Sequence, residues 1–145
     1  MLQLIMLNIA VGFLNEFVEK LSAEWALRVG LAATYIYSGF SIITAPDNWI
    51  GYLPGWFTNL VNVLMPVSVY MRIQGAGELI MALILLFWFS PRWLLLIVAL
   101  LSALEFAGIL ALSGIDIVTF HDIGLFGAAA ALVLLITKKE HSAEI

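Results

Sequence analysis

Long apolar runs dominate the pattern of hydrophobic and polar residues along the chain. A helix needs about 20 predominantly apolar residues to cross the hydrocarbon core of a bilayer. Four runs meet this length, and short polar or proline-containing connections separate them; they cover residues 25–45, 69–89, 93–112 and 117–136. The pattern predicts an all-α fold, a four-transmembrane-helix antiparallel bundle that forms one domain at residues 25–137.

The first 24 residues follow a different pattern. Leucines and valines recur every three or four positions from Leu4 to Leu21, whereas Asn8, Asn15 and Glu19 share another face. This periodicity is typical of an amphipathic helix, and its polar residues make it a poor membrane span. We expect residues 1–24 to form an interfacial helix on the membrane surface, and residues 138–145 to form a cytoplasmic tail.

Composition places the chain among integral membrane proteins, because 63% of its residues are hydrophobic, only 11% are charged and the mean hydropathy is +1.08. Ten acids against six bases give a net charge of −4, and no basic patch is present to bind nucleic acid. Cysteine is absent, which excludes disulfides, thiol chemistry and thiolate-held clusters within this chain. The expected partners are the lipid bilayer, other membrane or soluble subunits, or further copies of the chain.

Basic residues indicate the orientation of the spans. With four spans both termini lie on the same side of the membrane. Five of the six bases then fall on that side: Lys20, Arg28, Arg92, Lys138 and Lys139. Only Arg72 lies on the other side, so the positive-inside rule predicts a multi-pass protein of the cell membrane with both termini in the cytoplasm.

Ionisable residues inside the apolar runs are the candidates for function, because a charge at the centre of a membrane helix costs about 2.5–3.5 kcal/mol. At a rise of about 1.5 Å per residue, Glu78 and Glu105 lie at similar depths in the outer half of the membrane. The candidates for ligand binding or proton handling are Arg72, Gln74, Glu78, Glu105, His121 and Asp122. Polar residues of the first span at the same level are Tyr35, Tyr37, Ser38 and Ser41. Alternatively, the two glutamates are hydrogen-bonded contacts that hold helices together.

The connection between Pro46 and Pro66 is unusually apolar and carries Trp49, Tyr52 and Trp56. Such residues are typical of a segment at the level of the lipid head groups. The same segment is also placed to form a lid over the acidic residues. The glycines of Gly75-Ala76-Gly77 lie inside a predicted helix and look like packing or kink positions.

Motifs for enzymatic chemistry are not found. The sequence has no phosphate-binding glycine loop, no nucleophile elbow and no zinc-protease motif. His141 lies in the tail across the membrane from His121, so no two-histidine metal site is expected. We predict no metal and no intrinsic cofactor, expect that the chain is not catalytic alone, and assign no catalytic residue.

Several segments, in their order and spacing, resemble the DoxX-like family of small four-helix membrane proteins over residues 25–136. These segments are Leu27-Arg28-Val29-Gly30-Leu31, Tyr37-Ser38-Gly39, Pro46-Asp47, Arg72-Ile73-Gln74-Gly75 with Glu78, Ser90-Pro91-Arg92, and Asp116 through Gly124. Similar proteins carry arginine at the position of His121.

The resemblance implies a subunit of a membrane redox-associated complex, in which a pocket in the outer half binds a quinone or another amphipathic molecule. Glu78, His121 and Asp122 would then be its hydrogen-bond or proton partners, and membrane or soluble redox subunits its protein partners. Two alternatives remain open: a structural or assembly protein without a ligand, and a small-solute or proton-coupled transporter.

Overall fold

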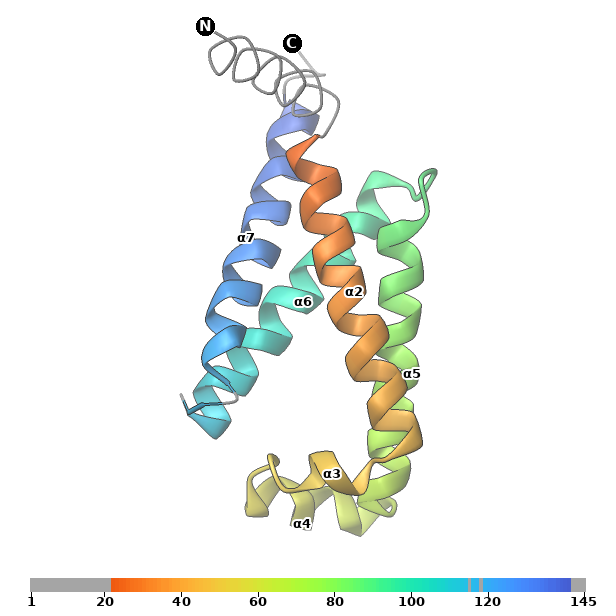
Figure 1. The fold of residues 1–145 in the computed structure, drawn as a ribbon, viewed down its shortest axis with the longest axis vertical. Helices are drawn as coiled ribbons and strands as arrows, with labels where there is room; N and C mark the ends of the chain where they lie inside the picture. The colour runs from red at the N-terminus through yellow and green to blue at the C-terminus, as the bar shows by residue number, and fades with distance from the viewer. Residues whose placement is uncertain (1–21, 115, 118, 142–145) are drawn as a thin grey trace, which may run out of the picture.

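The structure is a computed structural model that describes residues 22–114, 116–117 and 119–141, and these fold almost entirely into α-helices (Figure 1). The helices are α2 (Ala23–Thr44), α3 (Asp47–Ile50), α4 (Gly55–Leu64), α5 (Val67–Leu86), α6 (Arg92–Ser113) and α7 (Phe120–His141). Four of them, α2, α5, α6 and α7, are long and apolar enough to cross a membrane. The prediction of an all-helical chain with four candidate spans is confirmed. The predicted interfacial helix falls on residues 1–21, outside the described residues.

The four long helices associate as two pairs. α2 packs along α5, and α6 packs along α7, whereas α5 and α6 touch little although only the turn at 87–91 separates them. Figure 1 shows the pairs close together where α2 begins and α7 ends, and spread apart toward the opposite end. The short helices α3 and α4 lie at that opposite end, across the α2 and α5 pair.

Two glycines explain the tight pairing of α2 and α5. A Cβ atom built on Gly39 would lie 2.7 Å from the carbonyl oxygen of Gly75, and one built on Gly75 would lie 2.8 Å from that of Gly39. The two backbones therefore touch, as helices in lipid do where small residues face each other. Gly77 has nothing within 4 Å of its Cβ position, so only the first glycine of the Gly75-Ala76-Gly77 segment is a packing position.

Apolar packing is concentrated in two clusters. The larger one joins all four long helices around residues such as Leu31, Leu85, Val98 and Leu132. The smaller one joins the end of α2 to α4 and α5 at the opposite end and comprises Ile42, Val61, Val67 and Met71. Residues of both clusters, among them Phe106 and Ile42, border a space that polar side chains such as Glu78 and Glu105 also line.

Arg28 of α2 binds the C-terminal end of α5. Its side chain is 3% exposed, and its guanidinium donates hydrogen bonds to the carbonyl oxygens of Leu85 (2.7 Å) and Phe87 (2.6 Å). These carbonyls belong to the last turn of α5 and to Phe87, the residue that caps it, where backbone acceptors lack helical partners. The sequence identified Arg28 only as a charge near the start of a span, not as a cap on another helix.

Candidate functional site

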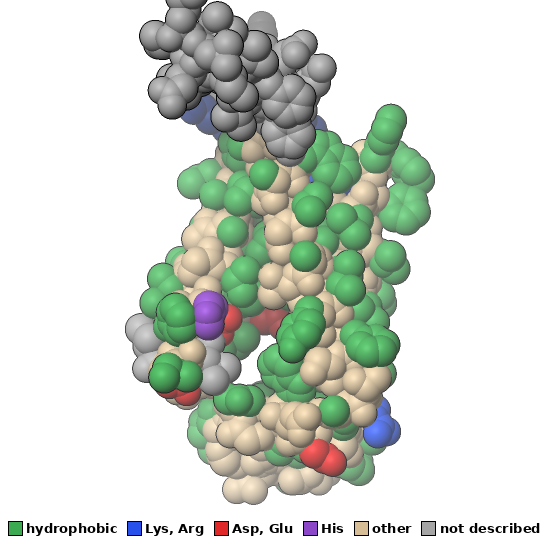
Figure 2. All heavy atoms as spheres, viewed as in Figure 1, with side chains coloured by type: hydrophobic (Ala, Val, Ile, Leu, Met, Phe, Trp, Pro, Cys, Tyr) green, Lys and Arg blue, Asp and Glu red, His purple; other side chains and the backbone are tan. Residues whose placement is uncertain are grey.

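A cavity of about 270 Å³ lies where the two helix pairs spread apart. Figure 2 shows the hollow on one face of the molecule, with acidic side chains at its back. Its walls come from α2, α3, α5, α6 and α7 and from the residues that follow α3. The side chains that line it with polar or aromatic groups are Thr34, Tyr35, Tyr37, Ser38, Trp49, Tyr52, Gln74, Glu78, Glu105, Phe106, Ser113, Thr119 and Asp122.

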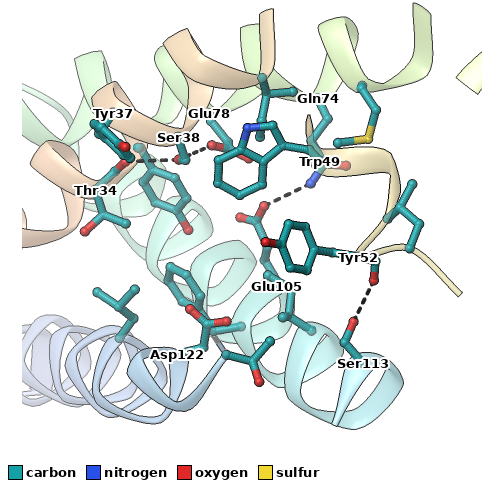
Figure 3. A pocket seen from close by; sticks show the side chains of 18 residues that line it. Thr34, Tyr37, Ser38, Trp49, Tyr52, Gln74, Glu78, Glu105, Ser113 and Asp122 are labelled. Atoms are coloured by element: carbon teal, nitrogen blue, oxygen red, sulfur yellow. Dashed lines mark hydrogen bonds between the residues drawn. The ribbon is translucent and has the colours of Figure 1, made fainter. Parts of the chain in front are cut away.

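Glu78 lies on α5 with only 4% of its surface exposed. Its carboxyl accepts a hydrogen bond from the hydroxyl of Ser38 on α2 (Figure 3). Ser38 precedes Gly39 in the chain, so the close contact of the two backbones brings this donor to the carboxyl.

Glu105 lies on α6, on the other side of the gap between the pairs. Its Oε1 atom accepts a hydrogen bond of 3.2 Å from the side-chain amide of Gln74 on α5. Gln74 stands one helical turn before Glu78, so both side chains point into the cavity from one face of α5. Hydrogen bonds therefore link α2, α5 and α6 across the region where apolar packing is interrupted.

Asp122 enters the cavity from α7. Figure 3 shows it on the opposite side from Ser38 and Glu78. The turn before α7 fixes its position, since the Thr119 amide donates to the Asp116 carboxylate (2.8 Å) and the Asp116 amide donates to the Thr119 hydroxyl (2.9 Å). This reciprocal pair starts the helix and leaves Asp122 in its first turn.

The hydroxyl of Tyr35 is buried at the site and is poorly hydrogen-bonded. Its side chain lines the cavity, is 1% exposed and stacks on Phe106 with ring centroids 5.9 Å apart. Its hydroxyl faces the Glu105 carboxyl and the Ser102 hydroxyl, but no described residue is placed within good hydrogen-bond geometry of it. A buried hydroxyl without a partner costs about 1–3 kcal/mol, so a group that enters the cavity and bonds to it would be stabilised there.

The segment from α3 to residue 53 closes one end of the cavity. Trp49, Tyr52 and Leu53 contribute to its lining. The indole of Trp49 donates to the hydroxyl of Ser41 (3.0 Å), and the hydroxyl of Ser113 donates to the carbonyl oxygen of Tyr52 (3.0 Å). The segment is thus attached to both helix pairs, an arrangement compatible with either a head-group segment or a lid.

The structure brings together four of the six candidate residues. Gln74, Glu78, Glu105 and Asp122 line the cavity, as do Tyr35, Tyr37 and Ser38 of the first span. Arg72 and His121 are exposed and are not part of the lining. The sequence analysis did not single out Thr34 or Thr119, and nothing in the pattern distinguishes them from other threonines in membrane helices.

The charges of the lining all have the same sign. It holds three carboxyl groups, and none of its described residues is lysine, arginine or histidine. In the described ranges, no three histidine, aspartate or glutamate residues lie together in a way that could hold a metal ion. The cavity is therefore lined by acidic and aromatic side chains and by the hydroxyl of Tyr35, which is not well bonded to any described residue.

No protein-family model, no curated protein and no solved structure matches this chain. The resemblance to DoxX-like proteins therefore stays a prediction based on the segments quoted above. The function has to be argued from the cavity and the residues that line it.

Proposed function

We propose that this chain is a multi-pass protein of the cell membrane that binds an amphipathic small molecule in the cavity between its two helix pairs. In a bilayer the four long helices would form an antiparallel bundle with both termini in the cytoplasm, and the cavity would lie in the outer half. The observation that carries the proposal is a formed cavity whose wall combines three carboxyl groups and the buried Tyr35 hydroxyl with aromatic and aliphatic side chains.

The lining suits a molecule with a polar and an apolar part. Glu78, Glu105 and Tyr35 present polar atoms, whereas Ile109 and Leu125 present hydrocarbon. Ligand sites in proteins typically combine a mostly apolar wall with a few polar groups that fix orientation. A volume of about 270 Å³ accommodates a head group and part of a chain, and the rest of the molecule would extend into lipid.

A quinone is one member of this class. Its carbonyl oxygens could accept hydrogen bonds from the Tyr35 hydroxyl and from the Gln74 amide. The chain would then serve as the membrane subunit of a redox-associated complex, in which electron carriers belong to partner subunits, because this chain has no cysteine.

Removal of the Tyr35 hydroxyl tests the proposal. The purified protein in dodecyl maltoside would be titrated with decylubiquinone, and lipids that copurify would be extracted and identified by mass spectrometry. Tyr35→Phe should weaken binding about two- to tenfold, the value of one hydrogen bond. Tyr70→Phe is the matched control, since Tyr70 lies on α5 but does not line the cavity. If neither a copurified molecule nor an added amphiphile binds to the wild-type protein, the proposal is wrong.

A structural or assembly role is the second candidate, and two hydrogen bonds favour it. Ser38 bonds to Glu78 between α2 and α5, and Gln74 bonds to Glu105 between α5 and α6. If the carboxyls serve only to join helices, Glu78→Ala should lower stability, whereas Glu78→Gln, whose amide oxygen still accepts from Ser38, should leave both stability and partner assembly intact. Loss of ligand binding in a stable Glu78→Gln variant would favour the binding function.

A further inference from the structure

The hydrogen-bond donors that reach the two cavity glutamates are neutral. Glu78 accepts from the Ser38 hydroxyl and Glu105 accepts from the Gln74 amide. An ionised carboxylate in apolar surroundings is costly unless a cation pairs with it. The described residues of the lining offer no cationic side chain, so a carboxylate there that is not neutralised by a proton needs a cation from outside the lining.

The arginines of the described chain are used or located elsewhere. Arg28 binds the end of α5 and lies 3.6 Å from Glu24, at the opposite end of α2 from the cavity. Arg72 and Arg92 are exposed and outside the lining. His121 adjoins Asp122 in sequence and attracts its carboxylate electrostatically, but its side chain is exposed and outside the lining.

Aromatic rings surround the same acidic space. Tyr35, Tyr37, Trp49, Tyr52 and Phe106 all line the cavity, and they come from α2, from α3 and the residues after it, and from α6. The face of an aromatic ring attracts a cation, and rings arranged around one space are a typical means of binding quaternary ammonium groups. The carboxyl groups and the aromatic rings therefore both favour a positively charged head group.

The opening of the cavity is placed for entry from the membrane. The hollow in Figure 2 opens on the face where α2 and α7 spread apart. Tyr37 lines the cavity and is nevertheless 76% exposed, and the apolar side chains of Ile36 and Phe40 near it in the chain are exposed as well. A molecule dissolved in the bilayer would reach the acids through this opening and leave its hydrocarbon tail in lipid.

From these observations we infer that the cavity binds an amphiphile with a positively charged alkylammonium head group. The inference rests on the proposed binding function and narrows its ligand class to cationic amphiphiles, which a neutral quinone is not. The cation sits between Glu78 and Glu105, the aromatic rings enclose it, and the Tyr35 hydroxyl bonds to a polar atom of the head group or to a water molecule that accompanies it. Two sources carry such an ammonium group, a free amphiphile and the head group of a membrane lipid, and the experiment below distinguishes them.

The test compares three probes of similar length that differ in charge: octyltrimethylammonium, decan-1-ol and decanoate. Each is equilibrated by dialysis with the full chain in dodecyl maltoside micelles, and empty micelles supply the blank. The ammonium probe should bind at least tenfold more tightly than the alcohol or the anion. Short-chain phosphatidylcholine and phosphatidylglycerol are then added as competitors. Displacement by phosphatidylcholine alone assigns the ammonium to a lipid head group, and displacement by neither assigns it to a free amphiphile.

Isosteric variants remove charge without removing hydrogen bonds. In Glu78→Gln and Glu105→Gln the amide oxygen can still accept from Ser38 and Gln74, so each variant should fold and should bind the ammonium probe at least fivefold more weakly. Asp47→Asn is the control, because Asp47 is exposed and outside the cavity. If circular dichroism shows that a glutamine variant is unfolded, Asp122→Asn makes the same comparison from α7.

The outcomes separate the inference from the function on which it rests. Equal binding of the ammonium probe and decan-1-ol, unaffected by Glu78→Gln, would overturn the cationic ligand and leave amphiphile binding intact. An equal loss in Asp47→Asn would show general charge attraction and would also overturn it. Failure of all three probes to bind would reject the binding function itself.

Discussion

Replacement of Gly39 by alanine tests the contact that shapes the site. Gly39 lies where α2 meets α5, and an added Cβ would lie 2.7 Å from the Gly75 carbonyl oxygen, 3.1 Å from Cγ of Leu79 and 3.2 Å from Cβ of Glu78. The nearest of these atoms is backbone, which cannot rotate away as the end of a side chain can. The two helices therefore have to separate in Gly39→Ala.

The size of the effect follows from the distances. Ordinary contact begins at 3.4 Å, so the backbones must move apart by about 0.7 Å near Gly75. Overfilling a packed interface costs about 1–3 kcal/mol. Alanine is also favoured over glycine within a helix by about 1 kcal/mol, which partly hides that cost. Gly30→Ala on the same helix has the same helical gain and nothing within 4 Å of the added atom, so the difference between the two variants isolates the contact.

The assay is reversible unfolding in dodecyl maltoside by titration with dodecyl sulfate, followed by far-ultraviolet circular dichroism. Gly39→Ala should have a free energy of unfolding about 1–3 kcal/mol below that of Gly30→Ala. Ligand affinity should fall in parallel, because Ser38 moves away from Glu78 when the backbones separate. Equal stability of the two variants, within about 0.5 kcal/mol, would refute the close approach of α2 and α5.

Three further predictions concern other parts of the chain. Arg28→Met should lower the free energy of unfolding by about 1–3 kcal/mol, because carbonyls at the end of α5 lose their donor. Glu24→Gln should change it by less than about 1 kcal/mol, and equal effects in the same titration would contradict the capping role. Ser113→Ala should speed amide hydrogen exchange at residues 50–53 without change in helix content; unchanged exchange would show that this bond does not hold the segment. Since the chain has no cysteine, a membrane-impermeant maleimide on intact cells should label Asn59→Cys and not Ala23→Cys, and the reverse pattern would invert the proposed orientation.

The four spans could be predicted because hydrophobic length alone determines them. Their ends depend on local hydrogen bonds that the pattern does not show. The last span was predicted from residue 117, whereas α7 begins at Phe120, because the reciprocal bonds of Asp116 and Thr119 form a turn first. The pairing of helices was not predictable either, since each span is apolar on most of its surface. Gly75 and Gly77 look alike in the sequence, and only Gly75 meets another backbone.

The level of the candidate residues along their helices could be predicted from the sequence, but the direction in which each side chain points could not. Counting the helical rise placed Glu78 and Glu105 at one level, and both line the cavity. Arg72 and Gln74 are also close in depth, but two residues along a helix rotate a side chain by about 200°, so Gln74 enters the cavity and Arg72 is exposed. The same rotation of about 100° per residue separates His121 from Asp122. Without the tilt and rotation of each helix, a sequence does not indicate which of two such neighbours faces inward.

The choice of carboxyl over amide side chains bears on what the site does. Ser38 and Gln74 donate to Glu78 and Glu105, and glutamine at either position would accept the same bonds without the risk of a buried charge. Helix association alone therefore gives no reason for acids here. It also gives no reason for a cavity bordered by aromatic rings, or for the buried hydroxyl of Tyr35 to lack a partner among the described residues. A cationic guest accounts for the carboxyl groups and the aromatic rings, and a polar atom or water molecule that accompanies it would accept from the Tyr35 hydroxyl. For this reason the charge-removing glutamine variants, rather than alanine variants, decide between a binding site and a structural contact.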